Sequence, residues 1–275
     1  MAQAARKKRS GDGGNGASAK NVVAAARGKS TQRREPVKLW ETVKGLIPVV
    51  VVFLALRTFL IEAYRIPSGS MEPTLLVGDF LFVNKLVFGP HIPFTNIHLP
   101  GYAEPKRGEV AVYQSPSQRP AIRISPDDST PTVVKRLVGI GGDTLFMRGG
   151  VLYVNGIEQR YANAAKPDPT IPDMPDSSFM WQKEVGLRAS RFGAAPATPT
   201  HDNWGPFVVP PGHVFGLGDS RYASVDARYY GFVPRNNVRG RPLIVYYSHD
   251  CANSDVPILC FITSVRGSRI GTRIR

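Results

Sequence analysis

Two serines lie close together in a constrained stretch of the chain, Pro67-Ser68-Gly69-Ser70. A serine hydroxyl becomes a nucleophile at neutral pH only when a base lies beside it. The stretch is therefore either an ordinary loop or a turn that holds a serine in position to react. The remaining residues that could supply a base decide between these two interpretations.

Histidine is an unpromising base in this chain. The histidines lie in proline-rich loops or next to glycine, and no Gly-x-Ser-x-Gly elbow occurs. Ser-x-x-Lys is absent too, which argues against an enzyme of the penicillin-binding type, and without His-Glu-x-x-His metal-dependent hydrolysis has no support. We expect neither a metal nor a cofactor. The histidines considered are His91, His98, His201, His213 and His249.

Lys135 is the remaining candidate base, because it lies in the apolar run TVVKRLVGI. In a strand, Val133, Lys135 and Leu137 share one face, and Arg136 points the opposite way. Burial between apolar neighbours favours the neutral amine. A pKa lowered from about 10.4 to about 8 would cost the fold about 3 kcal/mol and leave about a tenth of the amine neutral at pH 7. Most strand lysines are nevertheless solvated, so composition alone does not establish this role.

Four segments in order strengthen the case: PSGSMEPTL, GDFLFVNK, VVKRLVGIGGD and GDSRYASVDARYYGFVP. Together they resemble the conserved boxes of bacterial type I signal peptidases, the leader peptidases of the S26 serine protease family. The resemblance implies that Ser70 is the nucleophile and Lys135 the general base. It also implies that the Ser68 hydroxyl and the backbone N–H of Ser70 form the oxyanion hole, and that Ser224 orients the lysine amine.

The fourth box departs from the family pattern Gly-Asp-Asn-Arg-Asp-Asn-Ser at Ser220, Tyr222 and Ala223, although Ser224 stays in register. Its alternating charges are expected to form a salt-bridge network that supports the catalytic strand; they are Asp219, Arg221, Asp226 and Arg228. The resemblance also suggests residues that line shallow substrate pockets: Tyr64, Ile66, Pro67, Met71, Leu75, Val133 and Val134.

The implied reaction is hydrolysis of a peptide bond through an acyl-enzyme, with a Ser-Lys dyad. The implied substrates are exported preproteins, cut after a signal peptide with small residues at −1 and −3. Two alternatives stay open: a peptidase that matures one dedicated exported substrate, and a non-catalytic membrane-tethered β-domain. A self-cleaving repressor of the LexA type would share the Ser-Lys dyad. The repressor would need an N-terminal DNA-binding helix pair, for which the sequence gives no support.

The N-terminal region predicts how the site reaches its substrate. Residues 1–44 hold 11 of the 35 Lys/Arg against three acidic residues, and residues 1–43 are expected to be a disordered basic tail. An apolar run follows, with Arg57 as its one charge before Glu62, and predicts a transmembrane helix over 44–62. The positive-inside rule places the tail in the cytoplasm and the rest outside the plasma membrane. A cleaved signal peptide or a core helix are the alternatives.

Beyond the run the sequence predicts a mainly β, antiparallel catalytic domain over 63–147 and 212–250, because β-branched and aromatic runs alternate with glycine. Asn155-Gly156 between apolar residues predicts a hairpin. The region 148–211 is expected to be an inserted hairpin and cap; its proline- and alanine-rich part from Tyr161 to Pro211 is expected to be irregular and outside the core. Residues 251–275 form a C-terminal segment.

Two further features leave alternatives open. Cys251 and Cys260 could form a disulfide in an oxidising compartment or stay as buried thiols. The apolar stretch 82–99 could close the core or rest on membrane lipid; its apolar residues include Phe88, Ile92, Phe94, Ile97 and Leu99. The basic charge lies in the tail, apart from aromatic stacking residues, which argues against a nucleic-acid partner. We expect a monomer.

Overall fold

The computed structural model describes residues 39–275 apart from 93, 94, 96, 125, 163, 166 and 252–256. The predicted basic tail lies largely outside the described residues. The chain divides after Pro48, and the unit that begins at Val49 contains all the strands. Helix α1 (Leu39–Phe59) covers residues 44–59 of the predicted transmembrane segment, but the segment's last residues, Ile61 and Glu62, instead begin a strand. Within the described residues, however, no helix has the length and hydropathy needed to cross a bilayer, so the span is not confirmed.

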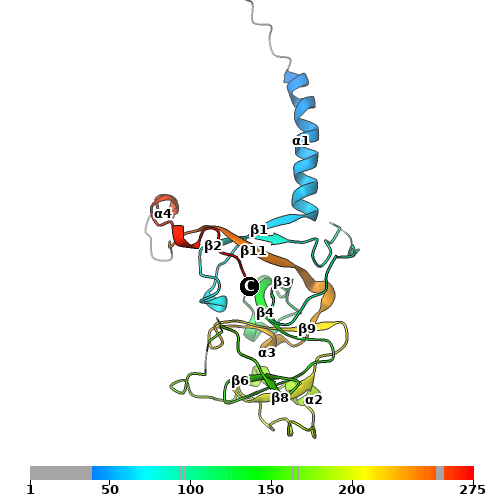
Figure 1. Ribbon diagram of the computed structural model, residues 1–275, viewed down its shortest axis with the longest axis vertical. Coiled ribbons are helices and arrows are strands. Elements are labelled where there is room, and N and C mark those ends of the chain that lie inside the picture. Colours follow the sequence, from blue (N-terminus) through cyan, green and yellow to red (C-terminus); the bar gives the residue numbers. More distant parts are fainter. Residues whose placement is uncertain are drawn as a thin grey trace, which may run out of the picture. The chain divides into compact units, whose positions relative to one another are not determined.

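A seven-stranded antiparallel sheet carries the predicted catalytic strand in its interior (Figure 1). Its order is β1 (Ile61–Arg65), β2 (Asp79–Asn84), β11 (Val238–Ser248), β3 (Val110–Gln114), β4 (Thr132–Ile140), β9 (His213–Leu217) and β10 (Val233–Pro234). Every neighbouring pair is antiparallel. The predicted β-rich fold class is therefore confirmed.

A second, four-stranded sheet has the order β7 (Ile157–Glu158), β6 (Val151–Val154), β5 (Thr144–Arg148) and β8 (Trp204–Val208), again with antiparallel neighbours. Strands β6 and β7 form the predicted hairpin: Asn155 and Gly156 connect them with φ values of 55° and 85°. A two-residue loop with both φ values positive matches the right-handed twist of paired strands, and Asn-Gly adopts it at low cost.

Strand β8 corrects the expectation that the Tyr161–Pro211 region lies outside the core. Trp204 and Phe207 are fully buried in one apolar cluster with Leu145 of β5 and Phe215 of β9. Two aromatic side chains in a proline-rich segment are enough to anchor it, because each buries a large apolar area. Preceding parts of the region form only short elements: η3 (Ser177–Phe179) and α2 (Gln182–Val185).

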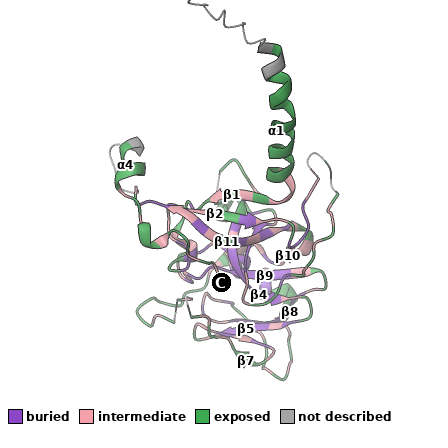
Figure 2. Ribbon diagram, turned by 45° about the horizontal axis from the view of Figure 1, so that its top comes forward, coloured by how far each residue is buried: buried purple, intermediate pink, exposed green. Residues whose placement is uncertain are grey.

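Three buried clusters make up the core, and β4 contributes to all of them (Figure 2, purple). The apolar stretch 82–99 divides between core and surface: Phe88 is fully buried, whereas Ile97 is 55% exposed. Phe94 lies outside the described residues.

Four further short helices lie between the strands: η1 (Gly69–Met71), η2 (Pro120–Ile122), α3 (Ala227–Tyr230) and η4 (Arg235–Asn237).

The C-terminal segment is fastened to the domain at several points. Cys251 and Cys260 form a disulfide, which ties α4 (Pro257–Thr263) to the end of β11. Beyond η5 (Gly267–Arg269), Ile274 packs against the apolar cluster that contains Ile66. The last residues of the chain therefore help to bury the region beside Ser68 and Ser70.

Candidate active site

Ser70 lies in the single turn η1, which directly follows the extended Ser68. The Glu72 N–H donates to the Gly69 carbonyl at 3.0 Å and closes the turn. From the fourth box, the Ser220 N–H donates to the Ser70 carbonyl at 3.2 Å. These two hydrogen bonds therefore fix the turn that carries Ser70 and attach it to the fourth box.

Lys135 reaches this hydroxyl from the middle of β4, where it pairs with Ala111 of β3. Its Nζ lies 2.6 Å from Ser70 Oγ, and the side chain is only 2% exposed. Burial lowers the pKa of Lys135 to about 8; Arg228 adds to the decrease, and Asp226 and Asp219 oppose it. An amine with such a pKa is partly neutral near pH 7, and a neutral amine can accept the serine proton.

Ser68 and Ser224 are the other two serines to which the resemblance assigns a role. The exposed Ser68 hydroxyl is 3.4 Å from Ser70 Oγ, which is a distance compatible with a weak hydrogen bond. Ser224 is 5% exposed, and its Oγ has no hydrogen-bond partner within the described structure. The expected hydrogen bond from Ser224 to the lysine amine is thus not formed here, and its orienting role stays a prediction.

Gly218 sets how closely the fourth box approaches the dyad, a role that the sequence analysis missed. A Cβ at this position would collide with both Cβ and Oγ of Ser224 and with the Ser70 carbonyl oxygen. The Gly218 N–H also donates to Asp226 Oδ2 at 3.0 Å. Glycine is needed here for lack of space, since any side chain would push Ser224 and Ser70 apart.

Arg136 is a second residue that the sequence analysis missed. Its side chain does leave Lys135 on the opposite face, but it is 4% exposed and pairs with Asp219 through two hydrogen bonds of 2.8 and 2.7 Å. Thr74 donates to the same carboxylate from the segment after η1. The ion pair therefore joins β4 to the fourth box and to the turn that carries Ser70. The only sign of this role in the sequence was an arginine within an apolar strand.

The second ion pair of the site is Arg228 with Asp226, and both side chains are fully buried. Arg228 Nε and a terminal nitrogen donate to Asp226 at 2.9 and 2.8 Å. Burial alone would raise the pKa of Asp226, but attraction and hydrogen bonding to Arg228 hold it below its usual value. The Arg228 guanidinium also contacts His201 Nε2, whose ring comes from the inserted region.

Arg221 corrects the expected four-residue network. Its backbone carbonyl accepts a hydrogen bond from Arg228 at 2.6 Å, but its guanidinium forms no ion pair with a described carboxylate. Asp226 therefore pairs with Arg228 within the box, and Asp219 pairs with Arg136 of β4. Arg221 belongs to neither pair. Alternation along the sequence did not reveal this, because the partner of Asp219 comes from β4.

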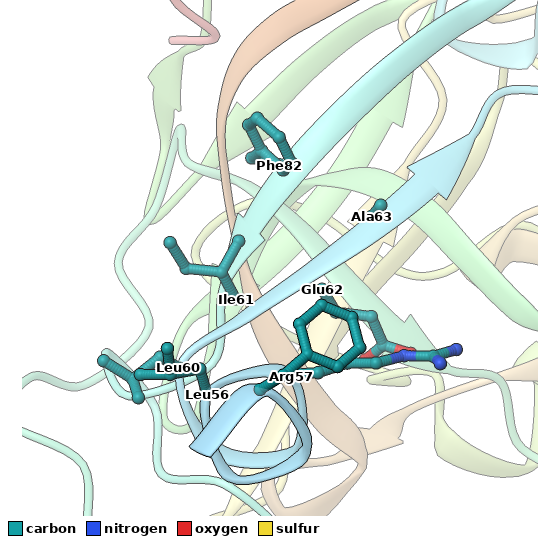
Figure 3. Close-up of a pocket in the computed structure, with 8 residues that line it drawn as sticks. Leu56, Arg57, Leu60, Ile61, Glu62, Ala63 and Phe82 are labelled. Carbon is teal, nitrogen blue, oxygen red and sulfur yellow. The ribbon is translucent and has the colours of Figure 1, made fainter. Parts of the chain in front are cut away.

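The residues expected to line the substrate pockets mostly gather beside the turn. Ile66, Met71 and Leu75 are buried in one cluster, with Tyr64 and Val134 packed at its edge. Val133 belongs to a different cluster, and Pro67 is exposed. Two cavities lie elsewhere. One of 510 Å³ contains Leu56, Arg57 and Phe82 (Figure 3), the other of 520 Å³ contains Arg221, and neither is lined by Ser70 or Lys135.

Known proteins resemble this chain over a region that includes all four segments. A family profile described as signal peptidase, peptidase S26, matches residues 39–247. The chain is 33% identical over 235 residues to signal peptidase I of Pseudomonas fluorescens, covering 78% of this chain and 74% of that one. It is 34% identical to signal peptidase I of Pseudomonas aeruginosa, with the same coverage. It is 30% identical to that of Haemophilus influenzae, covering 90% and 81%. The chain therefore belongs to the signal peptidase family, peptidase S26, and the prediction of a serine protease is confirmed.

Proposed function

We propose that this protein removes N-terminal signal peptides from exported preproteins by a Ser70–Lys135 dyad. The observation that carries the proposal is the 2.6 Å separation of Lys135 Nζ and Ser70 Oγ at an amine that is 2% exposed. A buried amine of lowered pKa next to a serine on a rigid turn is the arrangement that an activated nucleophile requires. Membership of the signal peptidase family supports the substrate class.

In the proposed reaction, neutral Lys135 takes the proton from Ser70 as its oxygen attacks the carbonyl carbon. The Ser68 hydroxyl and the Ser70 N–H stabilise the oxyanion; such a donor is typically worth about 2.7–4 kcal/mol of barrier. Collapse of the intermediate breaks the peptide bond, and Lys135 returns the proton to the leaving amine. Lys135 then takes a proton from water as the water oxygen attacks the acyl-Ser70 ester. It returns that proton to Ser70 Oγ as the ester bond breaks, which releases the carboxyl product and the free enzyme.

The finer parts of the proposal concern substrate and location. Tyr64, Ile66, Met71 and Leu75 pack densely beside the turn, which favours small substrate residues at −1 and −3. We place the anchor in the part of α1 that the sequence predicted, residues 44–59, in the plasma membrane, with lipid as a partner, the N-terminus in the cytoplasm and a monomeric catalytic domain outside. Ser70 follows Glu62 closely in sequence, so the site would lie near the membrane surface, where a cleavage point emerges.

The test uses detergent-solubilised full-length protein and two unrelated synthetic preproteins. Ser70→Ala and Lys135→Ala should each lower kcat by at least about 1,000-fold, as loss of a dyad member does in serine proteases. Ser117→Ala and Lys106→Ala, at exposed positions, should cleave normally. Mass spectrometry of the quenched reaction should find the acyl group on Ser70. Cleavage that survives Ser70→Ala would refute the dyad, and cleavage of only one preprotein would refute general signal peptide removal.

A further inference from the structure

A cavity of 520 Å³ lies between the β6–β7 hairpin, the segment after it and the fourth box. Two cationic side chains line it, Arg160 and Arg221, together with one carboxylate, Glu158. Arg160 Nε donates to Glu158 at 2.7 Å, so these two charges compensate each other at the surface. Arg221 is left as the uncompensated charge of the cavity. The remaining lining is uncharged: Gly150, Val151, Leu152, Gln159, Tyr161, Ala162, Ala164, Ala165 and Pro167.

The Arg221 side chain is 6% exposed, yet its guanidinium has no charged partner among the described residues. Its Nε is buried without a hydrogen-bond partner, and no described carboxylate lies within ion-pair distance of its guanidinium. Burial, reinforced by repulsion from Arg228, lowers the pKa of Arg221 to about 10, so the group still carries its charge at pH 7. A buried charge without a partner is costly, and a guanidinium presents a fork of donors that matches an oxyanion.

Tyr222, the next residue along the chain, does not act as a partner for the Arg221 guanidinium. The Tyr222 hydroxyl donates to Asp202 at 3.1 Å and accepts from the Asp168 N–H at 3.0 Å, so it is engaged away from Arg221. The lining residue Tyr161 does not compensate it either, because its ring lies against the Arg136 guanidinium at 5.6 Å. The Arg221 guanidinium therefore lines the cavity without a side-chain partner among the described residues, and an entering molecule could supply one.

The cavity is joined to the reacting serine through a short backbone path. The Ala165 N–H, in the cavity wall, donates to the Asp219 carbonyl at 2.7 Å. The next residue, Ser220, donates its N–H to the Ser70 carbonyl at 3.2 Å, and Arg221 follows it. A ligand held by Arg221 would thus fix the segment that positions Ser70.

We propose that the Arg221 cavity binds a small oxyanion, a carboxylate or phosphate group, through the Arg221 guanidinium. The anion comes either from solution or from an acidic side chain of the preprotein on the mature side of the cut. Only the second source depends on the proposed function. Binding of a free anion from solution can be measured even on a protein that cleaves nothing.

The experiment measures thermal unfolding of the full-length protein in detergent as sodium phosphate or acetate is added, with sodium chloride at matched ionic strength. Phosphate should raise the unfolding temperature of the wild type, because a ligand that binds only the folded state stabilises it. Arg221→Gln should weaken phosphate binding at least about ten-fold, the loss expected for one charge-assisted hydrogen-bonded pair. Arg191→Gln removes one exposed arginine outside the cavity and should behave as the wild type.

A second variant covers the case in which Arg221→Gln fails to fold. Ala164→Glu keeps the arginine and places a carboxylate on the cavity wall; it should raise the unfolding temperature without phosphate and abolish the phosphate effect. Peptides with Asp or Asn after the cut test the second source by their KM ratio in the wild type and in Arg221→Gln. Equal responses of all variants to phosphate and acetate, with no Asp preference, would overturn the proposal.

Discussion

Asp219 joins three segments of the site, because its carboxylate accepts hydrogen bonds from both Arg136 and Thr74. Arg136 directly follows the proposed base, and Thr74 follows the turn with the proposed nucleophile. The Arg136 guanidinium also donates to the carbonyls of Gly108 at 2.7 Å and Arg275 at 3.0 Å. The relative position of Lys135 and Ser70 therefore depends on a charged pair that touches neither of them.

Breaking this pair from one side should destabilise the protein strongly. Arg136→Met or Asp219→Leu leaves one buried charge without its partner, which typically costs about 3–5 kcal/mol. The double variant removes both charges and should recover much of the loss. Urea unfolding of the four proteins measures the coupling. Additive losses in the double variant would mean that the pair contributes no stability of its own.

The sequence predicts the pieces of the site better than their connections. Alternation along β4 correctly placed Arg136 and Lys135 on opposite faces, and the apolar neighbours predicted that Lys135 is buried. Alternation does not say what lies against the other face, so no partner was predicted for Arg136. Its partner Asp219 is 83 positions away, and only the strand order that puts β9 beside β4 brings them together. Pairing across such distances is a property of topology, which local patterns do not encode.

The same limit explains the two fold-level differences. Proline and alanine between Tyr161 and Pro211 predicted an irregular cap, but composition averages over the few residues that pack. Trp204 and Phe207 place β8 in the second sheet, where it pairs with the edge of β5 that β6 does not occupy. The charges of the fourth box predicted a single network, but a sequence cannot show that Arg221 faces a cavity. The Asn155-Gly156 hairpin was predictable because its conformation depends on local chemistry alone.

The pH dependence of cleavage should report Lys135. With its pKa lowered to about 8, the neutral fraction and therefore kcat/KM should rise about ten-fold per pH unit below 8 and level off above it. Steady-state kinetics between pH 6 and 9.5 on a short peptide measures this profile. A profile that is flat below pH 8 would exclude Lys135 as the general base.

Stability should depend on pH in the same region, with a sign fixed by the shift. The unfolded lysine titrates near 10.5 and the folded one near 8, so between these values the unfolded state binds more protons. Stability from this group therefore rises from pH 8 to pH 10.5, by about 3 kcal/mol in all, and the penalty is fully present below pH 8. Lys135→Met should lose this rise when unfolding is followed by urea titration at each pH.

Gly218 should be intolerant of even one methyl group. In Gly218→Ala the new Cβ would collide with Ser224 and the Ser70 carbonyl, so the fourth box must move and the dyad must separate. We expect kcat to fall by about 100-fold or more, since a misplacement of about 1 Å has this effect on an aligned reaction. Gly267→Ala is the matched control, because a Cβ there meets nothing within 4 Å. Equal activity of the two variants would contradict the tight approach.

Ser224 allows its proposed orienting role to be separated from a structural one. Its buried Oγ has no partner in this structure, so Ser224→Ala should leave stability unchanged or raise it by up to about 1 kcal/mol. If the hydroxyl orients the Lys135 amine only when substrate is bound, the same variant should lower kcat by about 10- to 100-fold with little change in KM. Cleavage kinetics and urea unfolding of one preparation give both values. A loss of stability with unchanged kcat would assign Ser224 to the core. A loss of kcat in a protein of full stability would show that Ser224 positions the base.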